Sequence, residues 1–568
     1  MGSMDGNQLD DRKASWFAFV VVIAVAFAFQ GSRGLWEPDE GTFCAVAGEM
    51  YDSGDLLVPT LHHNPYPEKP PLMYWGMVAG MKLLGRNEWG QRLFYAFCLA
   101  ASAAVTGLLA ASMWSRREGI LASMMFVTMA VPFVGGNIAR PDAPLLLGTT
   151  LALYCFWQSL GTRYATAWKM LMCASFGLAF LAKGPAALIF AAPMFVYLVC
   201  QGRALAYFLT PWALIGAVIF ALIGLSWYYY LIKLLPGVGT YFWDNQVSGR
   251  LVSGKYHRNP GLTKAFLVYG PILLFGGLPW ALLWPGWVNK MRPDVTHHQW
   301  WLALRHRPKA LLIATWVIVP TLVMSLASSK LPLYALPVFP AFALATARAW
   351  TQLSPEAARD SRMRLFAGVS AVLLIGIKCG MTYFPSDKDS RLFWTEMKDK
   401  IPAGSRQFIA IDQDLNGLGF YSNLEVVEVS AHHELYPAFV PRTHLDVELL
   451  NIAKSKVQCV IISKEKKRTQ LDKIEAQLKT LGVPYQEVSL HYKRKLLICN
   501  AEPQPTPKTS TEASPAKPSE TTDSPKTTDS PKSPKTTGTL ESPQMTKTTG
   551  TPGTTATPGE TSSNADKP

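Results

Sequence analysis

Residues 208–232 read FLTPWALIGAVIFALIGLSWYYYLI and contain no acidic or basic side chain. An α-helix of about 20 apolar residues crosses the ~30 Å hydrocarbon core of a bilayer, so this stretch predicts a membrane-spanning helix. The chain is 49% hydrophobic and 17% charged, whereas soluble proteins are roughly 25% charged. Further runs of the same character lie at 15–33, 91–114, 118–135, 143–160, 168–183, 186–201, 263–286, 310–328, 332–350 and 365–384. The sequence therefore predicts a polytopic α-helical membrane protein with about 11–13 transmembrane helices.

The formal net charge of +14 sits mostly in short loops between the apolar runs. In a soluble protein this excess would indicate nucleic acid, but loop cations are typical of membrane topology, so we expect no nucleic-acid partner. One alternate set of loops holds Arg116, Arg117, Arg163, Lys169, Arg203, Lys290, Arg292, Arg305, Arg307, Lys309, Arg359, Arg362 and Arg364. The positive-inside rule places these loops, and with them the N-terminus, in the cytoplasm. The outward set is then 34–90, 136–142, 184–186, 233–262, 329–331 and everything after about residue 385.

Composition divides the chain into three parts. Residues 15–384 are the predicted transmembrane domain, and residues 34–90 form its outer loop with surface helices. Residues 385–500 predict a small soluble α/β domain outside the membrane, which we expect to support the site or gate the acceptor. Residues 501–568 repeat Thr, Ser, Pro and Lys and predict a disordered tail. The expected elements of the soluble domain are strands at Gln407–Ile411 and Val457–Ser463 and a helix at Lys464–Leu481.

The first outer loop contains two acidic residues, Asp39 and Glu40, directly before a helical pattern. The apolar side chains that recur at i, i+3, i+4 and i+7 are Phe43, Val46, Ala47 and Met50. This spacing predicts a helix that lies on the membrane surface. Acidic residues at a helix start commonly cap it and complement its dipole. From the residues alone, capping and chemistry both remain open for this pair.

The same loop continues as Tyr66-Pro-Glu68-Lys69-Pro-Pro-Leu-Met-Tyr74-Trp75. A proline restricts the residue before it to an extended conformation, which gives the Lys69 side chain a defined direction. A fixed ammonium group beside the membrane suits a lipid phosphate. The alternative interpretation is an interfacial lysine that reaches the lipid headgroups, with Tyr74 and Trp75 as an aromatic belt.

The other outer loops add charges on the same face of the membrane. These residues are Arg140 and Asp142, Lys183, Lys330, and the group Arg250, Lys255, His257 and Arg258. Cations bind phosphate, and carboxylates can serve the acceptor side. The set therefore indicates a site for a lipid-phosphate substrate at the outer membrane surface.

These motifs resemble a known family. The matching stretches are Arg33-Gly-Leu-Trp-Glu-Pro-Asp39-Glu40-Gly41, Glu68-Lys-Pro-Pro-Leu-Met-Tyr74-Trp75, Arg140-Pro-Asp142, Lys183-Gly184 and Lys330-Leu-Pro332. They are similar to the bacterial relatives of the protein O-mannosyltransferases, closest to the branch of the aminoarabinose lipid A transferases. The resemblance covers most of residues 30–350.

The resemblance implies the C-type glycosyltransferase (GT-C) fold and an inverting transfer from an undecaprenyl-phosphate sugar. It implies that Asp39 and Asp142 are the two catalytic acids and that Lys69 binds the donor phosphate. It also places a divalent metal such as zinc at Glu68 and His257. We expect Arg250 or Arg258 to assist Lys69, and we expect supporting roles for Glu40, Tyr66, Lys183 and Lys330.

The expected function is a glycosyltransferase of the bacterial inner membrane. It would move 4-amino-4-deoxy-L-arabinose from undecaprenyl phosphate to a lipid A phosphate on the periplasmic face, among membrane lipids. Transfer to a protein hydroxyl or another glycan is an alternative, in which Asp39 would be the general base. A transporter or flippase of a lipid-linked substrate is an alternative of another class, although the loop position of the charges favours the enzyme.

Overall fold

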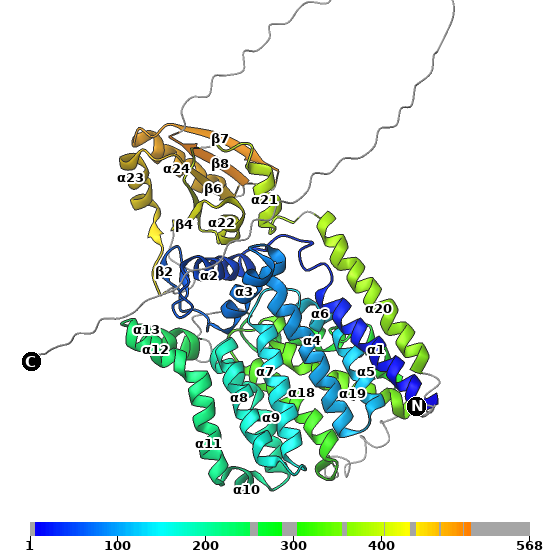
Figure 1. Ribbon diagram of the computed structural model, residues 1–568. Helices are drawn as coiled ribbons and strands as arrows, with labels where there is room; N and C mark the ends of the chain where they lie inside the picture. Colours follow the sequence, from blue (N-terminus) through cyan, green and yellow to red (C-terminus); the bar gives the residue numbers. More distant parts are fainter. Residues whose placement is uncertain are drawn as a thin grey trace, which may run out of the picture. The chain divides into compact units, whose positions relative to one another are not determined.

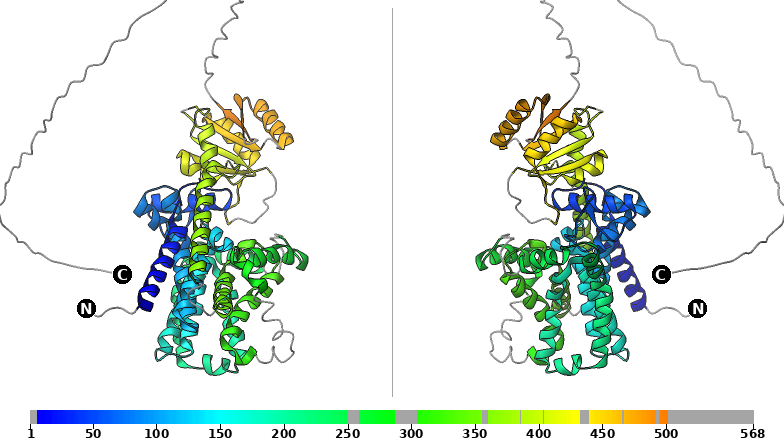
Figure 2. Two further views of the ribbon diagram at one scale, coloured as in Figure 1. Left: turned by 90° about the vertical axis from the view of Figure 1, so that its right-hand side faces the viewer. Right: turned by 90° about the vertical axis from the view of Figure 1, so that its left-hand side faces the viewer.

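The computed structural model describes residues 6–249, 259–286, 304–354, 360–384, 386–402, 404–431, 439–464, 467–491 and 494–500. All of these ranges belong to one compact unit, Met1–Gln504. Within this unit a helical bundle, a pair of surface helices and a sheet domain follow one another in space (Figures 1 and 2). The predicted tail lies outside the described residues.

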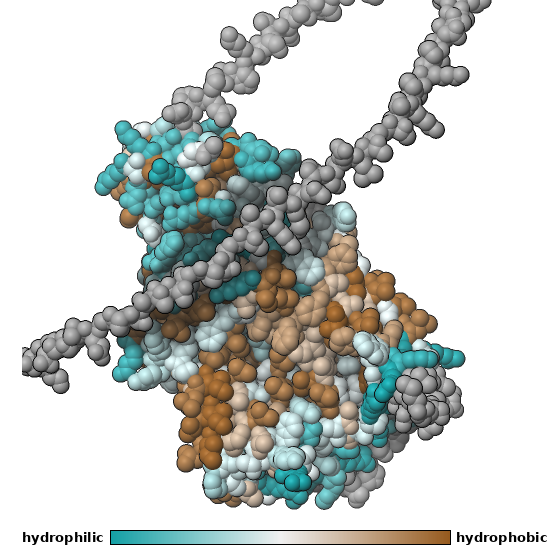
Figure 3. Space-filling model, viewed as in Figure 1, coloured by the Kyte–Doolittle hydropathy of each residue, from teal (hydrophilic) through white to brown (hydrophobic). Residues whose placement is uncertain are grey.

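The bundle consists of apolar helices whose outer faces carry large exposed hydrophobic side chains. The longer helices are α1 (Gly6–Phe27), α4 (Glu88–Met113), α5 (Arg116–Val127), α7 (Asp142–Ser159), α8 (Ala165–Lys183), α15 (Leu262–Phe275), α18 (Pro308–Leu326), α19 (Phe339–Leu353) and α20 (Asp360–Gly380). Shorter helices are α6 (Ala130–Gly135), α9 (Ala192–Cys200), α10 (Ala204–Phe208), α11 (Pro211–Phe220), α12 (Ser226–Leu234) and α13 (Val238–Tyr241). Leu214, Leu222 and Phe266 are each more than two thirds exposed, and apolar residues cover much of the middle of the bundle on the face seen in Figure 3. Such a surface needs lipid around it, so the chain is a multi-pass membrane protein.

Among the described residues, five helices are long and apolar enough to cross a membrane, and a bent pair, Leu262–Phe275 with Trp280–Gly286, makes a sixth. Several other predicted runs are helices with an interruption. The run at 332–350 begins as the 3-10 segment Pro332–Val338 before α19, and the run at 208–232 contains the π segment Ala221–Leu225. A proline begins the 3-10 segment, and the π segment has hydrogen bonds between residues five apart, so the regular α-helical part of each run is shorter than predicted. The count of about 11–13 spans stays a prediction.

The two ends of the bundle differ in charge. Arg117 pairs with Asp360 at 2.6 Å, Arg116 donates to Ser15, and Gln201 donates to the carbonyl of Arg305. These contacts gather loops of the predicted cytoplasmic set at the end where α10 lies, away from the surface helices (Figure 1). The described loops of the outward set meet at the other end.

The surface helices α2 (Asp39–Ser53) and α3 (Leu72–Leu84), with the hairpin of β1 (Thr60–Leu61) and β2 (Asn64–Pro65), lie between the bundle and the sheet domain. The predicted apolar face of α2 exists, since Phe43, Val46, Ala47 and Met50 are all buried. They share one core with side chains of α3 such as Tyr74. The helix prediction is therefore confirmed, but its apolar face packs against protein and not on the membrane surface.

The sheet domain is an open α/β structure with strand order β5-β4-β3-β6-β8-β7. The central strands β4, β3 and β6 are parallel, and β8 and β7 continue the sheet antiparallel. Its strands are β3 (Gln407–Ile411), β4 (Glu425–Ser430), β5 (Thr443–His444), β6 (Cys459–Lys464), β7 (Tyr485–Leu490) and β8 (Arg494–Cys499). Its helices are α21 (Ser390–Met397), α22 (Asn416–Ser422), α23 (Leu445–Ser455) and α24 (Arg468–Thr480). Three of these elements, β3, β6 and α24, coincide with the predicted strands and helix to within a few residues.

A buried carboxyl group, Glu37, joins the first outer loop to the sheet domain. Its Oε1 accepts hydrogen bonds from the Ser390 hydroxyl and the Gly417 backbone, both at 2.7 Å. Burial raises the pKa of Glu37 well above its ordinary value, against the effect of these two bonds. A Cβ on Gly41 would lie 2.1 Å from the other oxygen of this carboxyl group, so the helix can approach only with glycine there. This junction fixes the sheet domain above α2.

Candidate functional site

A cavity of about 1150 Å³ lies between the outer loops of the bundle and the sheet domain. The membrane part contributes three cations and two aspartates, with a tyrosine and a glutamate: Lys69, Arg140, Lys183, Asp39, Asp142, Tyr66 and Glu68. The sheet domain contributes Asp412, Asp414, Asn416, Glu428, Arg442, Lys467 and Lys473, among others. The cavity therefore brings together most of the residues that the sequence predicted, and it adds a second set.

Four charged side chains form a continuous row along the membrane side of the cavity. Arg140 lies 3.3 Å from an oxygen of Asp39 and 3.8 Å from an oxygen of Asp142. Lys183 binds the other oxygen of Asp142 at 2.5 Å. The Asp142 side chain is 2% exposed, whereas that of Asp39 is 44% exposed. Asp142 is thus held between two cations, and Asp39, the first residue of α2, faces the open cavity.

Lys69 lies in the turn before α3, where the prolines predicted a fixed direction. Its ammonium group binds Glu68 at 2.5 Å and lies 5.9 Å from the centre of the Phe43 ring. The other oxygen of Glu68 accepts the Tyr66 hydroxyl. Burial raises the pKa of Tyr66 well above its ordinary value, so this phenol remains a hydrogen-bond donor. The lysine is 12% exposed and lines the same cavity as Asp39.

Glu40 does not line the cavity. It is 1% exposed and binds Arg33 at 2.6 Å and Arg92 of α4 at 2.9 Å. It also accepts the backbone N–H of Ala139, directly before Arg140. Burial alone would raise the pKa of Glu40, but the two guanidinium groups lower it far below its ordinary value. Glu40 therefore connects the first outer loop to the second one.

Lys330 is also buried, at 1% exposure, and its ammonium group donates to the carbonyl of Ala327 at 2.5 Å. Burial lowers the pKa of Lys330. The cavity is lined by its two neighbours, Ser329 and Leu331, and not by this lysine. Its observed contacts are those of a residue that holds the loop together.

Three predicted site residues, Arg250, His257 and Arg258, lie outside the described residues. Within the described ranges, no group of three or more His, Cys, Asp or Glu side chains is arranged to hold a metal ion. Glu68 uses one oxygen for Tyr66 and the other for Lys69. Of the two residues predicted to hold zinc, only Glu68 lies among the described residues, so the zinc site stays a prediction.

The residues of the sheet domain that line the cavity were not predicted from the sequence. Its residues follow the carboxyl ends of parallel strands: Asp412 and Asp414 come directly after β3, and Lys467 comes after β6. Polar side chains at such strand ends are a general sign of a binding edge. The two aspartates that follow the predicted strand at Gln407–Ile411 could therefore have indicated this half of the cavity.

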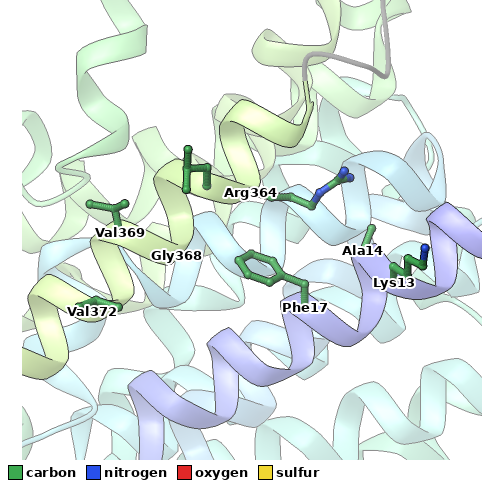
Figure 4. A pocket seen from close by; sticks show the side chains of 8 residues that line it. Lys13, Ala14, Phe17, Arg364, Gly368, Val369 and Val372 are labelled. Carbon is green, nitrogen blue, oxygen red and sulfur yellow. The ribbon is translucent and has the colours of Figure 1, made fainter.

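A second cavity lies at the other end of the bundle, between α1 and α20 (Figure 4). Most of its lining is apolar, with residues such as Phe17, Gly368 and Val372, and Lys13 and Arg364 also line it. None of its eight lining residues is a carboxylate. It thus lacks the acid and cation pairing found in the larger cavity.

Glu428 gives the cavity a pH-dependent element. Burial and the neighbouring Asp414 raise the pKa of Glu428 to about 7, while Arg442 opposes them. A raised carboxyl pKa stabilises the folded state at low pH, and that stability is lost as pH rises through about 7. We expect the melting temperature of the Glu428→Gln variant to fall less than that of the unmodified protein between about pH 5 and pH 8. Glu425→Gln is the control. A melting temperature that changes equally with pH in Glu428→Gln and in the unmodified protein would contradict this prediction.

Comparisons with known proteins agree with this geometry. A family model described as dolichyl-phosphate-mannose-protein mannosyltransferase matches residues 17–242. The chain is 30% identical over 391 residues to undecaprenyl phosphate-alpha-4-amino-4-deoxy-L-arabinose arabinosyl transferase 2 of Proteus mirabilis. It is 29% identical over 396 residues to the arabinosyl transferase of Photorhabdus laumondii. These alignments cover 66% and 65% of this chain, and the chain spans 66% of the length of each relative.

The fold has a solved counterpart. The crystal structure of ArnT from Cupriavidus metallidurans bound to undecaprenyl phosphate matches with a TM-score of 0.70 at 20% sequence identity. The match covers 86% of this chain and 98% of that one. The predicted polytopic GT-C fold with a small sheet domain is therefore confirmed.

Proposed function

Because this chain belongs to the membrane family of the dolichyl-phosphate-mannose-protein mannosyltransferases and aminoarabinosyl transferases, we propose that it is an inverting glycosyltransferase. It moves 4-amino-4-deoxy-L-arabinose from undecaprenyl phosphate to a phosphate of lipid A. The observation that carries this proposal is the row Asp39, Arg140, Asp142 and Lys183 beside Lys69 in one cavity. The cavity lies among outer loops and not midway along the bundle helices, which favours transfer over transport.

The cations of the cavity bind the donor phosphate. Lys69, Arg140 and Lys183 all line it, and each has an acidic partner that fixes its direction. When the sugar is transferred, the bond between its C1 and the phosphate oxygen breaks, and the electron pair leaves with the phosphate. Fixed cations in a partly dry cavity stabilise that developing charge without rearranging. The leaving phosphate needs no proton.

The two aspartates have different roles. Asp142 is buried and paired with Lys183, so it positions Lys183 and Arg140 and does not touch the acceptor. Asp39 faces the cavity and orients the donor sugar, whose amine is cationic at neutral pH. A lipid A phosphate is already an anion and attacks C1 directly, with inversion, because it needs no base. For a hydroxyl acceptor, Asp39 would take the proton.

The proposal places the transfer on the periplasmic side of the inner membrane. The N-terminus and the cation-rich loops of the bundle are then cytoplasmic, and the sheet domain is periplasmic. This orientation is supported by the grouping of Arg116, Arg117 and Arg305 at the bundle end away from the cavity. A metal bound by Glu68 and His257 remains a prediction, and the transfer proposed here uses no metal.

Replacing Asp39 by asparagine tests the proposal. We expect Asp39→Asn to lower kcat by about 10²-fold or more, because a misdirected donor sugar loses its alignment with the acceptor. The assay uses the purified protein, undecaprenyl-phosphate aminoarabinose and lipid A. Asp52→Asn, an exposed change in the same helix, is the control and should keep full activity. Unchanged kcat in Asp39→Asn would remove Asp39 from the mechanism.

A further inference from the structure

The sheet domain has the topology of a ligand-binding α/β fold. From β3 the chain runs outward through β4 to β5, and it then returns to place β6 on the other side of β3. In open α/β sheets, ligands bind at the carboxyl ends of the strands where the order reverses in this way. Here that point is the crevice between the ends of β3 and β6.

The crevice opens into the cavity described above. Asp412 and Asp414 after β3, Lys467 after β6, and Gln470 and Lys473 of α24 all line the same space as Asp39 and Lys69. One ligand can therefore reach from the crevice to the donor side without leaving the cavity.

A buried amide forms part of the crevice lining. Asn416 is 2% exposed, and its amide nitrogen donates to Thr42 of α2 and to Glu428. Its side chain also contacts His62, and this contact opposes the lowering of the His62 pKa by burial. These contacts hold Asn416 and Glu428 in place where both residues line the cavity.

The lining around this point contains two chemically different groups. From β4 and the segment after β3, Glu428, Asp414 and Asn416 contribute two carboxylates and an amide, and Arg442 binds both carboxylates. Lys473 of α24, which follows β6, lines the same cavity and makes no ion pair within the described ranges. Carboxylates and amides bind sugar hydroxyls, and a free ammonium group binds phosphate.

We propose that this crevice is the acceptor subsite, which holds the phosphorylated sugar headgroup of the acceptor while the donor lies beside Lys69. The sugar hydroxyls bind Asp414, Asn416 and Glu428, and a phosphate of the headgroup binds Lys473. This inference rests on the proposed function, since it assigns the second substrate of the same cavity. The sheet domain then recognises the acceptor and does not only support the fold.

Steady-state kinetics of the purified full-length protein test the subsite. The variants Lys473→Ala and Asp414→Asn should each raise the KM for lipid A about tenfold, because each removes one charge-assisted hydrogen bond. The KM for the undecaprenyl-phosphate donor should stay within about twofold of the unmodified protein. The matched controls are Lys479→Ala and Asp472→Asn, exposed residues of α24 that do not line the cavity. Acceptor KM values equal to those of the controls would overturn the subsite.

A binding measurement separates this inference from the proposed function. If the unmodified protein transfers no sugar to lipid A, the proposed function fails, and the crevice is then tested alone. The probe is deacylated lipid A, titrated into the protein without donor. Binding that weakens in Lys473→Ala but not in Lys479→Ala supports the subsite, and equal or absent binding overturns it.

Discussion

Replacing Lys69 by alanine is expected to lower kcat/KM for the undecaprenyl-phosphate donor by about 10²–10³-fold, as the loss of one fixed group from a charge-stabilising site does. The Lys69 side chain is 12% exposed and its ammonium group binds Glu68 beside the Phe43 ring. A water molecule that fills its place in the variant carries no positive charge and cannot stabilise the leaving phosphate in the same way. Arg140 and Lys183 remain in the variant and account for residual activity. Steady-state transfer at varied donor concentration measures the effect.

The Lys69→Ala result is informative only if the protein folds. Lys82→Ala removes an exposed lysine from the end of α3 and serves as the matched control. Both variants should elute and melt like the unmodified protein, because Glu68, the partner of Lys69, is 32% exposed and can be solvated when the lysine is removed. A Lys69→Ala protein that folds normally and retains its donor kcat/KM would contradict the assigned role.

The second large effect concerns stability. Glu40→Gln should lower the free energy of unfolding by about 3–5 kcal/mol, the usual cost of breaking a buried ion pair by removing one partner. Arg33 and Arg92 would keep their charges in a buried site with no carboxylate between them. The change also weakens the bond to Ala139 that holds the loop of Arg140 in place. Thermal unfolding in detergent measures the loss.

A matched surface change provides the scale for this effect. Asp52 pairs with Arg86 at 3.1 Å on an exposed part of α2, and such pairs contribute about 0–1 kcal/mol. Asp52→Asn should therefore leave the melting temperature nearly unchanged. Similar melting temperatures for Glu40→Gln and Asp52→Asn would show that the buried cluster is not needed for the fold.

The sequence predicted the fold well where periodicity and length carry the information. The stretch 208–232 and its counterparts predicted an apolar helical bundle, and Gln407–Ile411 predicted β3. The apolar face of α2 was also predicted, but not what covers it. Spacing shows which side of a helix is apolar, whereas the choice between lipid and the core with Tyr74 depends on the position of α3.

The residues that line the cavity were predicted in part for a similar reason. Charges in the outer loops indicated Asp39, Lys69 and Asp142, since sidedness alone places them on one face. Sidedness could not show that Glu40 is buried away from the cavity, because its partners come from α4 and from the loop at Ala139. The crevice in the sheet domain depends on the docking of two parts of the chain through Glu37, and no local pattern describes that contact.

The most direct test is mass spectrometry of lipid A from cells that lack aminoarabinosyl transferase activity, with and without this protein. The proposed function predicts that lipid A gains one 4-amino-4-deoxy-L-arabinose residue on a phosphate when the protein is present, and that the Lys69→Ala variant does not add it. A lipid A profile that stays unchanged although the folded protein and the undecaprenyl-phosphate donor are both present would contradict the account.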